Sequence, residues 1–241
     1  MSRSNNNNDQ LKNPATKWFE WDSDKSTIKY YDKEEKKHIH HKLPFTFLVL
    51  DQTATITGYN EQSQSGIYSN EVKSTKNDKL NVKAFKGGVL GNGLYVDIKD
   101  AVKSQGGKFT SNVYIAYKEG KQYALGCIQF KGASLQSWSD FSKNHRGAIM
   151  TKAIEIASFD RGKKGKVEYT TPAFTLRDAS EEANEKAVEM DKQLQEYFTQ
   201  YMGQQEAKQD LNTQLANESK ATQKHESPFV ESDEEISDLP F

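Results

Sequence analysis

The sequence is poor in the residues and segments that mark secreted, metal-bound or membrane proteins. It has a single cysteine, Cys127, among 241 residues, which excludes a disulfide framework and a cysteine-rich zinc site. No apolar run approaches the ~20 residues needed to span a bilayer, and residues 1–10 lack the apolar segment of a secretory signal. Hydrophobic residues make up only 34% of the chain, so part of it is expected to lie outside any packed core. These features suit a protein of the reducing cytoplasm.

Motifs that support catalysis are also missing. The sequence has no glycine-rich loop followed by Lys-Ser or Lys-Thr, no nucleophile elbow and no His-Glu-x-x-His. His38, His40 and His41 stand close together, but no acidic or cysteine residue has a recognisable ligand spacing to them, so we interpret them as part of a surface strand. We therefore expect a protein that is not an enzyme and that holds no cofactor and no metal.

Acidic side chains are under-represented in the long N-terminal part of the chain, and basic side chains are scarce in the C-terminal part. The net charge is −1, yet residues 1–177 carry 28 basic and 18 acidic side chains, whereas residues 178–241 carry 5 basic and 16 acidic ones. A protein without a charged partner would be expected to mix the two signs. The segregation predicts a body that binds a polyanion, followed by an acidic appendage.

The hydrophobic pattern of residues 16–177 is typical of a β-rich domain. Short β-prone runs alternate with glycine-containing turns, and the candidate strands are residues 27–31, 43–59, 66–73, 80–85, 94–98, 113–117, 123–130, 149–159 and 167–176. The stretch 43–59 changes its alternation and is expected to be bent or bulged. The aromatic cluster at 18–21 is expected to anchor a segment that leads into the domain, and residues 134–143 are expected to form one short helix. This pattern predicts a small closed or partly closed barrel.

The remaining segments differ in composition from this body. Residues 1–15 are rich in asparagine and are expected to be disordered. Residues 178–202 predict an amphipathic helix, capped by Asp178 or Ser180, that could pack on the barrel or pair with a second copy, so homodimerisation stays open. Residues 203–230 have the polar composition of a disordered linker, and residues 231–241 form an acidic tip.

The acidic tip carries the most specific motif of the sequence. It contains five acidic residues and no basic one, and it closes in Asp-Leu-Pro-Phe. A basic, apolar pocket of a partner can capture a terminal aromatic residue together with its carboxylate, and an inert solubilising tail is the alternative. The residues expected to bind a partner are Asp233, Glu234, Glu235, Asp238, Leu239, Pro240 and Phe241.

This ending resembles the acidic tips of bacterial and phage single-stranded DNA-binding proteins, of the Asp-Asp-Ile-Pro-Phe kind, which follow a flexible polar linker. Leu239 stands where the usual residue is Ile, and the resemblance covers only the tip and the composition of the linker. The body is similar to the divergent phage type, an OB-fold with insertions. The resemblance implies sequence-independent binding of single-stranded DNA in replication, recombination and repair, in the host cytoplasm and without a membrane. It also implies recruitment of polymerase, helicase or primase-class proteins by the tip.

The body has the two elements that single-strand binding requires, which are cations for the phosphates and aromatic faces on which bases stack. Residues 72–177 carry 19 basic and 8 acidic side chains, with aromatic residues between them. Residues 161–166 form a basic turn between two strands, like the L45 loop of an OB barrel; a solvated hairpin tip is the alternative. The nucleic-acid-binding candidates are Lys83, Lys86, Lys103, Lys108, Tyr114, Tyr117, Lys131, Arg161, Lys163, Lys164 and Lys166.

Alternation along a strand favours Tyr114 among the aromatic residues, most of which are otherwise expected to fill the core. Tyr114, Ala116 and Lys118 share one strand face, whereas Ile115 and Tyr117 share the other. Because a face with small and polar neighbours suits a nucleic acid better than a purely apolar one, Tyr114 is predicted to stack on a base.

Two other classes of function remain open at this stage. A nuclease or other DNA-processing enzyme would need clustered carboxylates, which the basic body does not display. A structural or host-interaction protein could use the segregated charge for self-assembly, and salt-sensitive oligomerisation without affinity for DNA would favour it.

Overall fold

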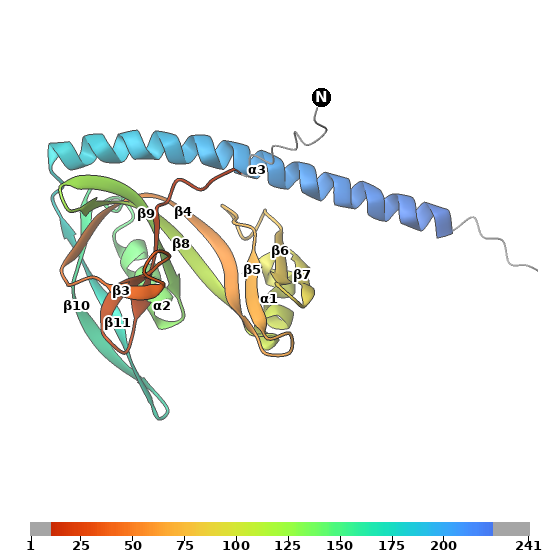
Figure 1. Cartoon of the computed structure of the whole chain (residues 1–241), viewed down its shortest axis with the longest axis horizontal. Helices are drawn as coiled ribbons and strands as arrows, with labels where there is room; N and C mark the ends of the chain where they lie inside the picture. Colours follow the sequence, from red (N-terminus) through yellow and green to blue (C-terminus); the bar gives the residue numbers. More distant parts are fainter. Residues whose placement is uncertain (1–10, 224–241) are drawn as a thin grey trace, which may run out of the picture. The chain divides into compact units, whose positions relative to one another are not determined.

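Residues 11–223 are described by a computed structural model, in which strands predominate and three helices occur (Figure 1). The strands are β1 (Lys17–Asp22), β2 (Thr27–Asp32), β3 (Lys37–His40), β4 (Phe45–Asn60), β5 (Ser65–Ser69), β6 (Leu80–Ala84), β7 (Gly88–Gly93), β8 (Gly107–Glu119), β9 (Gln122–Lys131), β10 (Ala153–Lys164) and β11 (Val167–Arg177). The helices are α1 (Tyr95–Ser104), α2 (Ala133–Asn144) and α3 (Glu181–Gln223). The fold is mainly β, as the hydrophobic pattern predicts.

One mixed sheet contains all these strands. Its main path runs β3-β2-β1-β9-β8-β4-β5-β6-β7, and β10 joins it by pairing with the first residues of β4. Neighbouring strands are antiparallel except β1 and β9, which are parallel. β11 pairs with β10 alone, so no ladder among the described strands closes the sheet into the expected barrel. The physical reason is that β1 occupies the edge of β9 on which a closing strand would have to pair.

Two hydrophobic cores lie on the same side of the long central strands β4 and β8. Phe47 and Ile115 belong to the main core, which α2 covers with the buried indole of Trp138. Ile56 belongs to the second core, which lies under β5, β6 and β7 and which α1 covers with Ile98. We call the opposite, largely polar side of the sheet the outer face.

A bulge between Val49 and Asp51 lets β4 contribute to both cores. Side chains alternate along a strand, so Phe47 and Ile56 would point to opposite sides without an additional residue between them. The bulge brings Ile56 back to the core side and leaves Thr55 on the outer face. The bend expected within residues 43–59 is therefore confirmed.

Two predictions about local structure are wrong. Residues 18–21 do not merely lead into the domain but form most of β1, with Phe19 fully buried and Trp18 on the other face. Residues 94–98 are not a strand, because α1 begins at Tyr95. Their short alternation imitates a strand, but the buried residues Ile98 and Val102 are four apart, which is the spacing of one helix face.

The helix predicted at 178–202 is present and begins at Glu181, where Ser180 accepts a hydrogen bond from the amide of Ala183 (3.2 Å). Its residues up to Phe198 belong to the same compact unit as the sheet and bury Leu194 and Phe198. α3 continues to Gln223, through most of the segment expected to be a linker. The Gln, Lys, Glu and Ala residues of that segment are good helix formers, which composition alone does not distinguish from a polar coil.

The terminal predictions fall largely outside the described residues. Residues 1–10, the end of the expected linker and the whole acidic tip at 231–241 lie there. Residues 11–15, which were expected to be disordered, are described, and the Asn13 amide donates a hydrogen bond to the Tyr114 hydroxyl (2.7 Å). This contact attaches the start of the described chain to the centre of β8.

Candidate nucleic-acid interface

The outer face combines polar and basic side chains from five adjacent strands. Direct pairing places these side chains beside one another, since residues opposite each other in a ladder point to the same side. The members are Lys29 of β2, Glu20 and Asp22 of β1, Gln129 and Lys131 of β9, Lys108, Thr110 and Asn112 of β8, and Thr53, Thr55 and Thr57 of β4. The predicted residues Lys108 and Lys131 are thus on one surface.

The middle of the outer face is a floor of small, uncharged side chains. Gln129 donates to Asn112 across β9 and β8 (3.1 Å), and the hydroxyls of Thr57 and Thr110 are 2.7 Å apart across β4 and β8. Thr110 and Asn112 are buried. Their hydrogen bonds are satisfied within the sheet, so they add no charge between the cations.

Acidic side chains of β1 hold two of these lysines in place. Glu20 accepts from Lys131 (2.7 Å) and is 3.4 Å from the ammonium of Lys29, which is also 3.2 Å from Asp22. Burial opposes ionisation of Asp22, but hydrogen bonds from His40, the Lys25 amide and Lys29 outweigh it and hold its pKa well below the ordinary value. Lys131 is therefore correctly placed as a surface cation, although it is paired rather than free.

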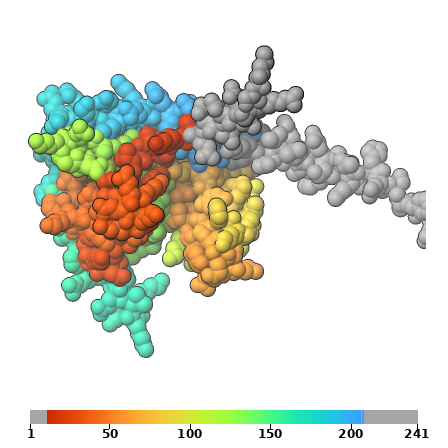
Figure 2. Space-filling view, viewed as in Figure 1, coloured from red at the N-terminus to blue at the C-terminus, as the bar shows by residue number. Residues whose placement is uncertain are grey.

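The basic turn predicted at 161–166 is the tip of the long β10–β11 hairpin, which projects from the sheet as a finger (Figure 2). The strands continue to Lys164 and resume at Val167, so the reversal is tighter than expected. Gly165 has a φ of +61°, a conformation that favours glycine. The four cations Arg161, Lys163, Lys164 and Lys166 are all exposed.

The side chain of Tyr169 explains the second glycine of the hairpin. Gly162 pairs directly with Tyr169, and a Cβ at Gly162 would lie 2.5 Å from the tyrosine ring. The ring therefore rests on bare backbone in the middle of the hairpin. Any larger residue at Gly162 would displace it.

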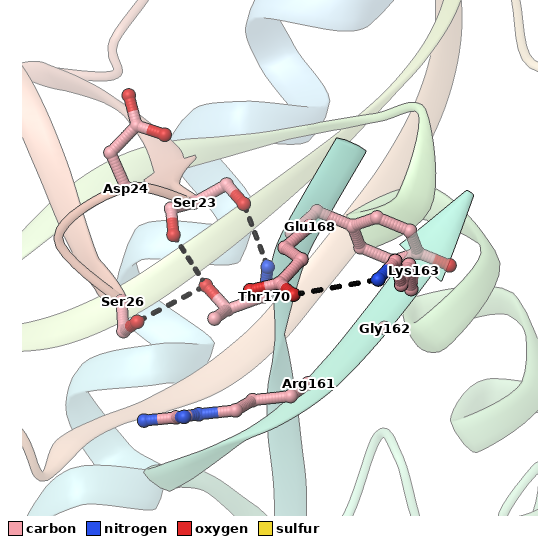
Figure 3. Close-up of a pocket in the computed structure, with 9 residues that line it drawn as sticks. Ser23, Asp24, Ser26, Arg161, Gly162, Lys163, Glu168 and Thr170 are labelled. Atoms are coloured by element: carbon pink, nitrogen blue, oxygen red, sulfur yellow. Dashed lines mark hydrogen bonds and ion pairs between the residues drawn. The ribbon is translucent and has the colours of Figure 1, made fainter. Parts of the chain in front are cut away.

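A hollow of about 540 Å³ separates the hairpin from the turn between β1 and β2 (Figure 3). Thr170 connects its two walls: its amide donates to the Ser23 hydroxyl (2.7 Å) and its hydroxyl donates to the Ser23 carbonyl (2.7 Å). Arg161 lines the hollow and makes no ion pair with an acidic side chain among the described residues, whereas Lys163 is 3.9 Å from Glu168.

A second hollow, of about 190 Å³, links the hairpin to the outer face. It shares Ser23, Tyr169 and Thr170 with the first hollow and extends to Gln129 and Lys131 on β9. The cations of the hairpin and those of the sheet are therefore neighbours along one surface, although residues 131 and 161 are far apart in the sequence.

The other predicted lysines divide between the two sides of the sheet. Lys83 pairs directly with Tyr68, Lys86 is exposed in the turn after β6, and Lys108 is exposed on the outer face. Lys103 is exposed on α1, which covers the core side. The structure thus brings Lys83 and Lys108 to one face and places Lys103 on the opposite side.

Tyr114, which is predicted to stack on a base, and Tyr117, the other aromatic binding candidate, are both buried, so neither ring is exposed for stacking. Tyr114 does lie on the outer face, but Phe198 of α3 packs against it edge to face with ring centroids 5.1 Å apart. Tyr117 lies in the main core beside Phe19, with ring centroids 5.0 Å apart. Burial raises the pKa of both phenols above the ordinary value. Alternation places Tyr114 on the correct face but does not predict that α3 covers it.

Other aromatic side chains are exposed instead. They are Trp18, Tyr31, Tyr59, Tyr68, Phe85 and Phe159. Among them Phe85 belongs to the aromatic residues interleaved with lysines in the sequence, whereas Tyr59 and Tyr68 carry no individual signal apart from their alternation with buried neighbours. These residues, rather than the buried tyrosines, offer ring faces to solvent.

The histidines do not converge on a common ligand. His38 and His40 share one face of β3, as their spacing predicts, and His40 is 3.0 Å from Asp22. His41 packs among Phe19, Tyr30 and Phe45, and burial lowers its pKa. Among the side chains that the structure describes, no three His, Cys, Asp or Glu residues are grouped to hold a metal ion, and no described helix is long and apolar enough to cross a membrane.

Comparison with known proteins adds no relative to this description. The chain has no significant match to a family model, to a curated protein or to a solved structure.

Proposed function

We propose that this protein binds single-stranded DNA without sequence preference along a basic surface made by the β10–β11 hairpin and the outer face of β9 and β8. The observation that carries the proposal is a pair of hollows that share Ser23, Tyr169 and Thr170, one lined by Arg161 and Lys163 of the hairpin and the other by Lys131 and Gln129 of the sheet. A chain of phosphates can follow such a path, because cations line both hollows.

Electrostatics support a polyanionic ligand over a neutral one. No ion pair between described residues involves Arg161, Lys164 or Lys166, so these cations are free to neutralise phosphates. The floor of threonine and amide side chains has its hydrogen bonds satisfied within the sheet. It therefore supplies few groups for reading base edges, which fits binding without sequence preference.

We further propose that the central strands form an OB-like unit with insertions. In an OB-fold the ligand crosses the second and third strands between the loops that follow the first and fourth. We take β4, β8, β9, β10 and β11 as the five strands. The outer face of β8 and β9 then corresponds to the face of the second and third strands, and the hairpin tip corresponds to the loop that follows the fourth strand. The segment of β5 to β7 and α1 is then an insertion after the first strand, and β1 to β3 precede the unit.

The measurement that tests the proposal is an intrinsic fluorescence titration with a poly-dT oligonucleotide and with a matched duplex, at low and moderate salt. We expect tight binding of the single strand, weak binding of the duplex, and an affinity that falls with salt by a log–log slope of about −0.7 for each phosphate contacted. A protein that gives no response to the single strand at low salt, with and without its acidic tip, would remove the proposal.

The acidic tip, whose residues lie outside the described part of the chain, completes the proposal as a recruiting segment. We expect removal of residues 231–241 to tighten single-strand binding about tenfold at low salt and to have little effect at high salt, because the acidic residues compete with phosphates for the cations. The matched control is Phe241→Ala, which keeps every acidic residue: it should leave DNA affinity unchanged and abolish capture of replication or recombination proteins. Unchanged or weaker affinity after truncation would contradict the competition.

A further inference from the structure

A row of three residues on the outer face of β4, β5 and β6 alternates ring, glycine, ring. Tyr59 pairs directly with Gly66, and the amide of Phe85 donates to the Gly66 carbonyl (3.0 Å), which continues the β6 register by one residue. Tyr59 is 51% exposed and Phe85 is 77% exposed. The next row on the same face holds Tyr68 directly opposite Lys83.

The glycine at the centre of this row serves neither a turn nor close packing. Its backbone does not have a positive φ, and a Cβ added to Gly66 would meet no heavy atom within 4 Å. Glycine inside a strand weakens the strand and often marks a place where a ligand approaches the backbone closely. Since strands lie about 4.8 Å apart, the backbones of Tyr59 and Phe85 are separated by roughly 10 Å across this open floor.

Charges beside the row select the class of ligand. Lys83 lies opposite Tyr68 and two residues before Phe85, the exposed Lys86 follows Phe85 in the chain, and Lys108 lies on the same face because it pairs with Thr57, two residues before Tyr59. None of these three lysines makes an ion pair within the described part of the chain. Flat aromatic surfaces flanked by unpaired cations fit a nucleotide, whose base stacks while its phosphate is neutralised.

We propose that Tyr59, Gly66 and Phe85 form a subsite that holds one base of the bound single strand, with Lys83 and Lys86 at the adjoining phosphates. The subsite rests on the proposed function and answers a question that the burial of Tyr114 raises, namely where a base can stack. It extends the phosphate path from Lys131 past Lys108 onto the β5–β7 segment, which lies outside the OB-like strands.

The sharpest test fills the open floor at Gly66 and keeps the rings of Tyr59 and Phe85. Gly66→Val places a β-branched side chain on the open floor, where its Cβ meets no heavy atom within 4 Å and where valine suits a strand, so the fold should be retained. We expect about a tenfold loss of affinity for a fluorescently labelled poly-dT oligonucleotide, measured by anisotropy. The matched control is Gly147→Val, at an exposed glycine in the connection after α2 whose Cβ position is equally open, and it should leave the affinity unchanged.

A second measurement locates the base directly. An oligonucleotide carrying 5-iododeoxyuridine should crosslink on irradiation to the wild-type peptide that contains Tyr59 or Phe85, and Gly66→Val should lose that crosslink. If circular dichroism shows that Gly66→Val is unfolded, the double variant Tyr59→Ala/Phe85→Ala takes its place. The subsite alone is overturned if the wild-type protein binds the strand without the crosslink and the variant binds it as tightly as wild type. Wild-type protein that binds no single strand overturns the proposed function together with the subsite.

Discussion

Neutralising the hairpin tip, by the combined change Arg161→Ala, Lys163→Ala, Lys164→Ala and Lys166→Ala, is expected to lower single-strand affinity on the order of 100-fold at about 50 mM salt. The four side chains are exposed, and only Lys163 makes an ion pair within the described residues, with Glu168. Loss of four phosphate contacts should also make the log–log salt slope shallower by about 3. Anisotropy titrations at several salt concentrations measure both quantities.

A control for this variant must remove cations from elsewhere on the protein. Lys99 and Lys103 are exposed on α1, which covers the core side of the sheet. The double variant Lys99→Ala/Lys103→Ala should bind within about twofold of wild type when it is compared with Arg161→Ala/Lys163→Ala. Equal losses in the two double variants would show that overall charge, and not the hairpin, determines the affinity.

Trp138→Ala is expected to lower the free energy of unfolding by about 3–5 kcal/mol. The indole is buried and stacks on Phe130 with ring centroids 5.1 Å apart, and its N–H donates to Gln52 at 3.3 Å. It is the main contact of α2 with the core, so truncation leaves a cavity under the helix and an unpaired amide oxygen at Gln52. Because small domains are stable by only about 5–15 kcal/mol, the variant should be close to unfolding.

Urea denaturation followed by circular dichroism measures this change. Trp18→Ala removes the same side chain from a position that is 36% exposed and should lower the free energy of unfolding by roughly 1–2 kcal/mol. If Trp138→Ala had an effect no larger than that of Trp18→Ala, α2 would not be held to the sheet by this residue.

Local patterns predict the strands but not how the sheet ends. The runs at 113–117, 123–130 and 167–176 lie within β8, β9 and β11, because each is a β-prone run that borders a glycine-containing turn. Closure of the sheet, in contrast, depends on which strand pairs with the free edge of β9. β1 takes that edge in parallel, and such long-range pairing leaves no periodicity in a sequence.

The residues of the candidate site also divide into those that local sequence predicts and those that depend on long-range contacts. The hairpin cations are predictable because a basic turn between two strands is a local feature, whereas Lys108 and Lys131 are predicted only from the basic composition of residues 72–177. The burial of Tyr114 is not predictable, because it depends on Phe198, which is distant in sequence and reaches Tyr114 only through the docking of α3. Tyr59 and Phe85 flank Gly66 only once three strands are in register.

Because of the bulge in β4, the number of residues in that strand matters as much as their identity. Deleting one residue between Val49 and Asp51 would not shorten a loop; it would exchange the two faces for every residue that follows in the strand. Ile56 would then turn to the outer face, and Thr55 and Thr57 would enter the second core. Insertions and deletions should therefore be tolerated in the turns around β4 and excluded from the strand itself.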